Sequence, residues 1–222
     1  MYGEAVITLL TVQNTQTVSR VEIMPLDLVE QQLQAVVEDI PPAFAKTGAL
    51  GSVEIVEMVA RQALKLVVDP VMISKHGSPL MSADAQAAVR SKLLPASYLI
   101  TPNLHEAAAL TGRENATAFW YAHAISDLGA RRVLIKGGHG EGPATDVYFE
   151  NGQAHEFTTE RLPTKNTHGT GCTFSAAITA ELAKGTEITT AIDRAKRFIF
   201  EAIRTNPELG RGVGPLNHHA AI

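Results

Sequence analysis

The chain has 222 residues, of which 45% are hydrophobic and 19% are charged, with a net charge of −4 and one cysteine. This size and composition allow a sizeable core, and we expect a single domain over residues 1–222. The weak negative charge without a basic cluster argues against nucleic-acid binding, and no apolar run approaches the roughly 20 residues that span a bilayer. One cysteine cannot form an intrachain disulfide, so we expect a cytoplasmic protein.

Hydrophobic periodicity predicts strands that alternate with helices along the chain. We expect strands over residues 5–12, 18–24, 44–47, 66–68, 98–101 and 132–136, then a hairpin of 146–150 and 155–159 that turns at Asn151-Gly152. Helices are expected over residues 26–39, 53–64, 83–94, 104–112, 116–128, 172–184 and 188–204. This order predicts an α/β fold with an open, mainly parallel sheet and helices on both faces. The glycine-containing turns at 75–78 and 137–142 are expected to be mobile.

Two glycines frame the start of the helix predicted from residue 172. The run NTHGTGC, residues 166–172, leads directly into that helix. Amide groups of a first helical turn bind phosphate or a developing oxyanion, and glycine allows a close approach. The residues expected to surround this anion are Gly169, Thr170, Gly171 and Cys172. The alternative is a glycine-rich loop before an ordinary packed helix, with Cys172 as a small core residue.

Six blocks of the chain, in order, resemble the ribokinase-like superfamily. They are VITLLTVQNT (6–15), DIPPAFAKTGALGS (39–52), VVDPVM (67–72), LPASYLITPNLHEA (94–107), VLIKGGH (133–139) and GVGPLNH (212–218). The cysteine in the anion-binding motif is similar to that of hydroxymethylpyrimidine and phosphomethylpyrimidine kinases of thiamine biosynthesis. The resemblance implies a ribokinase-like kinase that transfers the γ-phosphoryl group of ATP to 4-amino-5-hydroxymethyl-2-methylpyrimidine, to its monophosphate, or to both. A pyridoxal kinase of the cysteine-containing type and a non-catalytic binding paralogue remain the alternatives.

Phosphoryl transfer to an alcohol needs an acceptor for the hydroxyl proton, donors around the transferring group and a divalent ion. Cys172 suits the acceptor role because the N-terminus of a helix lowers the pKa of a thiol, and the resemblance implies the same role. Gly169, Thr170 and Gly171 would supply the donors.

Two carboxylates are candidates for holding Mg²⁺. Asn103 and Glu106 match the superfamily's Asn-x-x-Glu motif, in which the carboxylate reaches the ion. The same spacing is also a helix capping box, and both interpretations can hold at once. Asp69 ends a predicted strand and is expected to steer magnesium-bound water or phosphate, although Pro70 could simply fix it in a turn.

The nucleotide and ring contacts come from the resemblance. Lys136, with Asn103 and Thr170, is implied to contact the nucleotide, although a lysine ending a strand can simply lie on the surface. The predicted ring contacts are Gln13, Val71 and Ala49. The amide of Gln13 can donate and accept hydrogen bonds, which suits an aminopyrimidine. Val71 would wall the pocket or be a core valine, and Ala49 stands where the family usually has methionine.

Three further expectations follow. Family members begin with an earlier glycine-rich segment that helps bind the pyrimidine alcohol, so part of the substrate pocket is expected to be missing from this chain. Either the true start lies upstream of Met1, or a partner segment fills the gap, or the chain is a decayed paralogue. His218-His219 should be an exposed pair, because the histidines lack metal-ligand spacing. The partners should be the small-molecule substrate and a second copy of the chain, forming a homodimer, with no nucleic acid and no membrane.

Overall fold

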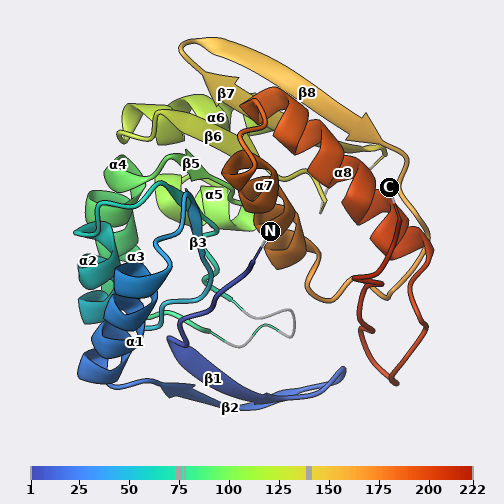
Figure 1. Ribbon diagram of the computed structural model, residues 1–222. Coiled ribbons are helices and arrows are strands. Elements are labelled where there is room, and N and C mark those ends of the chain that lie inside the picture. Colours follow the sequence, from blue (N-terminus) through green and yellow to red (C-terminus); the bar gives the residue numbers. More distant parts are fainter. Residues whose placement is uncertain (1, 74–76, 78, 139–141, 222) are drawn as a thin grey trace.

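Six strands form the central sheet of the computed structural model, which describes residues 2–73, 77, 79–138 and 142–221 (Figure 1). In sheet order they are β3 (Ala45–Thr47), β4 (Leu66–Val68), β5 (Leu99–Ile100), β6 (Arg132–Ile135), β7 (Ala144–Glu150) and β8 (Gln153–Thr159). Strands β3 to β6 are parallel, and β7 and β8 add an antiparallel hairpin. The prediction of an open, mainly parallel sheet is confirmed. Because the parallel strands are in register, their carboxyl ends meet at one edge of the sheet.

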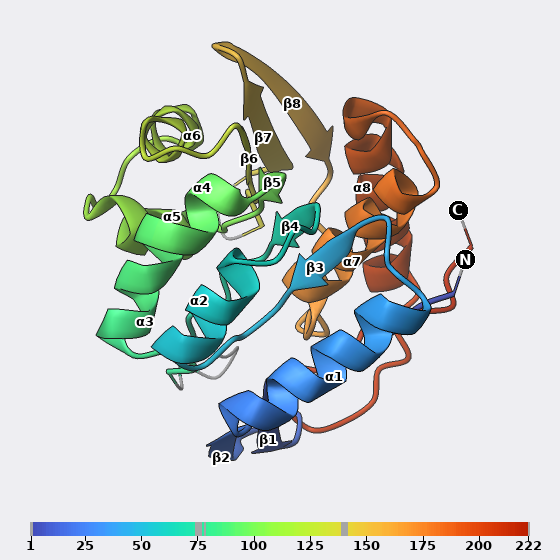
Figure 2. The same cartoon turned by 60° about the vertical axis from the view of Figure 1, so that its left-hand side comes forward.

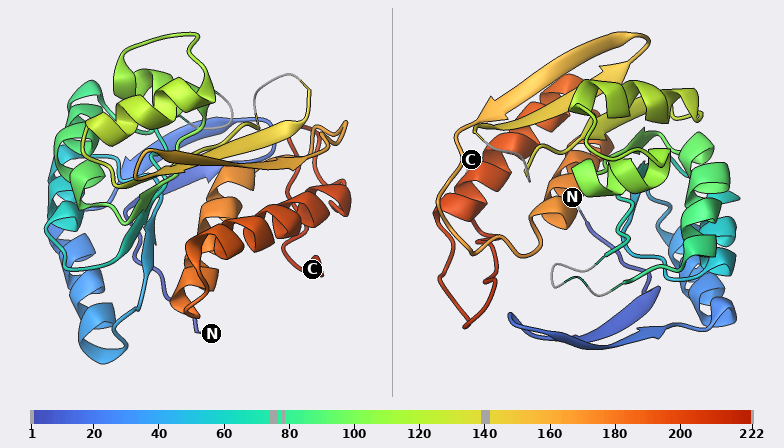
Figure 3. Two further views of the ribbon diagram at one scale, coloured as in Figure 1. Left: turned by 90° about the horizontal axis from the view of Figure 1, so that it is seen from above. Right: turned by 180° about the vertical axis from the view of Figure 1, so that it is seen from behind.

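Helices cover both faces of this sheet, as predicted (Figures 2 and 3). One face carries α1 (Leu26–Asp39), α2 (Val53–Ala60), α3 (Ala83–Ala88), α5 (Leu104–Thr111) and α6 (Ala118–Asp127), and the other carries α7 (Thr170–Ala183) and α8 (Ile188–Arg204). Side chains alternate across each strand, so Val67, Leu99 and Leu134 pack with α7 and α8, while Val68 and Ile100 pack with the first group. Strands β4 to β6 are therefore buried on both faces.

A separate two-stranded antiparallel sheet consists of β1 (Leu9–Gln13) and β2 (Val18–Ile23) (Figure 3). Its first strand begins four residues later than predicted, since residues 5–8 are not in a strand. The Thr8 hydroxyl donates to the Ala49 carbonyl at 2.7 Å, and Ile23 lies 3.0 Å from where a side chain on Gly51 would begin. The β1–β2 sheet therefore lies beside the carboxyl end of β3.

Most predicted elements agree with the structure to within a few residues, and the differences have local causes. Helix α2 ends at Ala60 rather than at residue 64. The helix expected over 83–94 is divided into α3, a π-helical turn (Val89–Leu93) and α4 (Leu94–Ala96). Pro95 has no amide hydrogen for a regular i→i−4 bond, which accounts for the interruption. The hairpin turn at Asn151-Gly152 is confirmed, with positive φ at both residues.

Parts of two predicted loops lie outside the described residues, namely 74–76 and 78 in one turn and 139–141 in the other. Across the described part of the chain, no helix has the length and apolar character needed to cross a membrane.

Candidate active site

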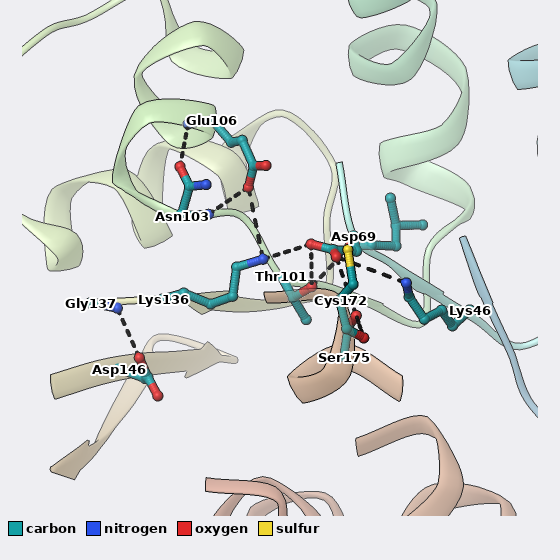
Figure 4. Close-up of polar contacts among 11 residues, drawn as sticks. Lys46, Asp69, Thr101, Asn103, Glu106, Lys136, Gly137, Asp146, Cys172 and Ser175 are labelled. Atoms are coloured by element: carbon teal, nitrogen blue, oxygen red, sulfur yellow. Dashed lines mark hydrogen bonds and ion pairs between the residues drawn. The ribbon is translucent and has the colours of Figure 1, made fainter. Parts of the chain in front are cut away.

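Asp69 is the centre of a buried polar cluster at the carboxyl ends of the parallel strands (Figure 4). It directly follows β4, is 1% exposed, and its carbonyl accepts the amide of Val71 at 2.9 Å, as expected of a turn at Pro70. Lys136 and Lys46 reach its carboxylate from opposite sides, with Nζ–O distances of 2.6 and 4.0 Å. Burial alone would raise the pKa of Asp69, but the two lysine charges outweigh burial and lower it. Asp69 is therefore a turn residue and also an ionised member of the cluster.

Lys136 directly follows β6, and its ammonium group contacts two carboxylates. Its amide donates to the Pro102 carbonyl at 2.8 Å, and its ammonium group lies 2.6 Å from Asp69 Oδ1 and 3.9 Å from Glu106 Oε2. Burial by itself would lower the pKa of this lysine, but the charges of Asp69 and Glu106 raise it. At 8% exposure Lys136 is not a surface lysine, and it carries its positive charge inside the site.

The Asn-x-x-Glu motif forms the predicted capping box and also faces the cluster. The Asn103 side chain accepts the Glu106 amide at 2.9 Å, and Glu106 Oε2 accepts the Asn103 amide at 2.8 Å. Glu106 is 8% exposed, and its burial, with a contribution from the Asp69 charge, raises its pKa to about 7. Both of its contacts, with Asn103 and Lys136, use the same oxygen. The capping interpretation of this motif is confirmed, and the magnesium interpretation stays a prediction, since Glu106 faces the cluster.

Helix α7 starts at the predicted glycines. Gly169 caps it with a φ of 83°, a conformation that favours glycine, and its carbonyl accepts the Thr173 amide. The amide and hydroxyl of Thr170 both donate to the Thr167 carbonyl, at 3.3 and 2.8 Å. The next amides, of Gly171 and Cys172, belong to the first helical turn, whose amides have no acceptor within the helix.

Gly171 brings the positive end of α7 against Lys136. A Cβ atom at Gly171 would lie 3.1 Å from the Lys136 ammonium group. Only a residue without a side chain allows this approach at no steric cost. A helix N-terminus and a buried cation therefore converge on one point, which is an arrangement that attracts an anion.

Cys172 exposes its thiol to solvent beside Asp69, which excludes a core role (Figure 4). The Ser175 hydroxyl lies 3.0 Å from the Cys172 carbonyl and 3.3 Å from Asp69 Oδ2. The protein atoms around the sulfur reduce its hydration and, together with the Asp69 charge, raise the pKa of the thiol despite Lys46 and Lys136. The expected lowering of this pKa is therefore wrong, because the loss of hydration at the sulfur and the Asp69 charge outweigh the two lysine charges.

Metal binding can be judged from the donor set. Among the described residues, no group of three or more His, Cys, Asp or Glu side chains could hold a metal ion by itself. Mg²⁺ commonly binds through one or two carboxylates plus water and substrate phosphates. Glu106 and Asp69 would supply the two carboxylates of such a site.

The sequence analysis missed three residues that contact this cluster: Lys46, Thr101 and Ser175. Lys46 is the middle residue of the short strand β3, one position before its end, whereas Asp69 and Lys136 directly follow their strands. Thr101 follows β5 and lies 3.5 Å from Asp69 Oδ1. Ser175 is three residues after Cys172, on the same side of α7. A search for polar residues at the ends of all predicted parallel strands would have found the first two.

The predicted ring contacts are distributed over two regions. Ala49 and Val71 are half-buried and follow the paired strands β3 and β4, the strands that carry Lys46 and lead into Asp69. Gln13 is exposed at the end of β1 in the separate sheet. His218 is exposed as predicted, but its Nε2 lies 3.2 Å from the Thr173 hydroxyl, so it contacts the first turn of α7.

Sequence comparison shows to which family this chain belongs. A sequence model of the family described as phosphomethylpyrimidine kinase matches residues 1–217. The chain belongs to this family. It is 44% identical over 226 residues to the thiamine biosynthesis bifunctional protein ThiED of Geobacter sulfurreducens, a match that covers 98% of this chain and 46% of that protein. It is 39% identical over 233 residues to the hydroxymethylpyrimidine/phosphomethylpyrimidine kinase of Staphylococcus aureus, covering 100% of this chain and 84% of the relative.

Solved structures agree with this assignment. The pyridoxal kinase of Bacillus subtilis, in its ADP complex, matches with a TM-score of 0.90 at 36% identity, over 99% of this chain and 87% of that chain. The phosphomethylpyrimidine kinase of Clostridium difficile matches with a TM-score of 0.79 at 38% identity, over 91% of this chain and 87% of that chain. The chain is thus a phosphotransferase with the ribokinase-like α/β fold.

Proposed function

We propose that this chain transfers the γ-phosphoryl group of ATP to 4-amino-5-hydroxymethyl-2-methylpyrimidine, to its monophosphate, or to both, in thiamine diphosphate biosynthesis. The observation that carries the proposal is the convergence of the α7 N-terminus, Lys136 and the exposed Cys172 thiol in a member of the phosphomethylpyrimidine kinase family. The convergence attracts the phosphates, and the family relationship supports the pyrimidine alcohol.

Each part of the cluster has a role in this proposal. Lys136 binds the phosphates of ATP, and the amides of Gly171 and Cys172 stabilise the charge on the transferring group. Gly169 and Thr170 hold the turn that presents these amides. The Cys172 thiolate accepts the hydroxyl proton of the substrate. Lys46 supplies a second positive charge beside Asp69, opposite Lys136.

Glu106 and Asp69 are the proposed contacts for Mg²⁺, with Asn103 orienting Glu106 through the capping box. Bound Mg²⁺ would neutralise phosphate charge during the transfer. With its pKa raised to about 7, Glu106 is partly protonated near neutral pH, so Mg²⁺ binding would release a proton from this carboxyl group.

The ring of the substrate is proposed to lie between the β1–β2 sheet and the carboxyl ends of β3 and β4. Gln13 would hydrogen-bond the ring, and Ala49 and Val71 would line the pocket. A pyridoxal kinase is the second candidate function, because the Bacillus subtilis pyridoxal kinase has a TM-score of 0.90 and because Ala49 leaves more room than methionine.

A substrate comparison tests the proposal. Purified protein with Mg²⁺ and ATP is offered hydroxymethylpyrimidine, its monophosphate and pyridoxal, and product formation is followed by mass spectrometry. We expect kcat/KM for a pyrimidine substrate to exceed that for pyridoxal by about tenfold or more, the scale of discrimination by pocket shape. A preference for pyridoxal would reassign the substrate, and ligand binding without turnover of any alcohol would indicate a binding paralogue.

The domain organisation, cellular location and oligomeric state belong to the same proposal. We propose that residues 1–222 act as one kinase domain, because the family match runs from residue 1 to residue 217. A cytoplasmic homodimer is also proposed, and sedimentation of the purified protein checks its oligomeric state.

A further inference from the structure

A second buried ion pair lies outside the active-site cluster, between strand β7 and helix α8. Asp146 is 4% exposed and Lys196 is 7% exposed. Lys196 Nζ donates to Asp146 Oδ2 at 2.6 Å and to the Ala144 carbonyl at 2.7 Å. The other carboxylate oxygen, Oδ1, accepts the amide of Gly137 at 2.8 Å. One aspartate therefore joins α8 to the residue that directly follows Lys136.

The backbone at Gly137 has little freedom to move. A Cβ atom there would lie 1.8 Å from the Thr145 carbonyl oxygen, so the chain after β6 is pressed against β7. On the carbonyl side, the Arg161 guanidinium donates to Gly138 at 2.6 Å and to Gly137 at 3.3 Å. The amide of the preceding residue, Lys136, is held by the Pro102 carbonyl at 2.8 Å. Hydrogen bonds thus fix the main chain on both sides of the Lys136 side chain.

A buried ion pair that joins a strand to a helix carries a large desolvation free energy. Apolar side chains of similar volume often stabilise a fold equally well, because two charges must leave water. Burial raises the pKa of Asp146 even though Lys196 opposes the change, which shows how strongly the site disfavours the charge. An apolar pair, however, could not accept the Gly137 amide. The feature that requires a polar side chain at position 146 is therefore the contact with the active-site strand.

We propose that Asp146 is a positioning residue that holds the Lys136–Gly137 peptide, so that the Lys136 ammonium group stays between Asp69 and the start of α7. Lys196 balances the buried charge of the aspartate, and the aspartate oxygen that accepts the Gly137 amide orients the main chain. This inference rests on the proposed function, in which Lys136 binds the phosphates of ATP. It assigns a role to an ion pair that lies outside the active-site cluster.

The chain offers a matched control at the opposite end of the same two strands. Arg132 and Glu150 are cross-strand partners on β6 and β7, and their side chains form an ion pair at 2.8 Å. Arg132 is the first residue of β6, whereas Lys136 follows its last. Loss of this pair should weaken the same strand pairing without moving the Lys136 ammonium group.

Two double variants separate the hydrogen bond from the ion pair. Asp146→Asn with Lys196→Met removes both charges but keeps an oxygen that can accept the Gly137 amide, whereas Asp146→Leu with Lys196→Met removes that acceptor as well. We expect the asparagine variant to keep its KM for MgATP within about threefold, and the leucine variant to raise it about tenfold or more, since small misplacements at an active site carry such costs. KM for the pyrimidine should stay within about twofold in both variants, because Lys136 binds phosphate.

Glu150→Gln should leave all kinetic constants within about twofold, even where its Tm falls as far as that of the leucine variant. Equal KM values for MgATP in the two double variants would overturn the inference. If the leucine variant fails to fold, a loss of MgATP affinity in the folded asparagine variant would overturn it as well. The wild-type chain is assayed alongside with each alcohol. If it phosphorylates none, the proposed function fails, and calorimetric titration with MgADP then compares the same variants.

Discussion

The two sheets of this protein differ in how firmly their residues are held. In the six-stranded sheet, β4 and β5 are completely buried, and the side chains of Asp69 and Lys136, which follow β4 and β6, lie 2.6 Å apart. In the β1–β2 sheet most residues are exposed or half-buried, and the turn between the strands is held by a few contacts, such as the Val213 amide on the Thr15 carbonyl at 2.8 Å. Substitutions in the six-stranded sheet disturb a packed network, whereas most side chains replaced in the β1–β2 sheet are in contact with solvent.

This difference separates two tasks of the proposed kinase. The residues proposed for phosphoryl transfer lie at the ends of the buried strands and on α5 and α7, where several contacts fix each side chain. The proposed ring contact Gln13 lies on the exposed sheet, where a side chain can change at small cost to stability. The arrangement offers a physical reason why a pyridoxal kinase and pyrimidine kinases both resemble this chain closely. The predictions below test this division, beginning with the buried sheet.

The largest effect is expected at Cys172. Cys172→Ser should lower kcat by roughly 10²-fold or more, the usual scale for an acid–base group. Because the pKa of the thiol is raised, the thiolate fraction grows with pH above the ordinary range, so wild-type kcat/KM should rise into the alkaline region. The serine variant should lack this rise. Its Tm should be unchanged because the thiol is exposed, and near-normal turnover would show that Cys172 has no part in proton transfer.

A smaller effect is expected at Glu106. Glu106→Gln keeps an oxygen for the Asn103 amide but removes the charge, so half-maximal rate should require about tenfold more Mg²⁺. In the wild type, the carboxylate is protonated below its pKa of about 7, so its affinity for Mg²⁺ should increase as the pH rises through that value. Magnesium titrations on either side of this pH check both points. An identical response of the two proteins would limit Glu106 to its capping role.

The smallest effect is expected in the β1–β2 sheet. Gln13→Ala should raise KM for the pyrimidine about fivefold, since a typical hydrogen bond contributes about 1 kcal/mol, and leave KM for MgATP unchanged. Ser19→Ala is the matched control, because it removes a side-chain hydrogen bond to the Val12 carbonyl in the same sheet. If the two variants behave alike, or if the constant for MgATP changes instead, ring recognition does not depend on Gln13.

The sequence predicted much of this molecule because many of its signals are local. Alternating strands and helices, the cap at Asn103, the turn at Asn151-Gly152 and the start of α7 all depend on residues close together in the chain. The positions of Asp69 and Lys136 at strand ends also follow from local patterns, and the parallel order of the sheet brings such ends together. These features could be derived before any contact was known.

The tertiary structure decided everything that depends on charges brought together from distant segments. The pKa of Cys172 is raised, against the local expectation from a helix N-terminus, because the fold removes water from around the sulfur and places Asp69 beside it. Lys46 joins the site only because β3 pairs with β4. The contact of Asp146 with the Gly137 amide requires β7 to return antiparallel to β6, and Lys196 completes it from a helix 50 residues further along the chain. Sequence patterns show which residues can form strands and caps, but the strength of an electrostatic interaction depends on separation and burial, which exist only once the chain has folded.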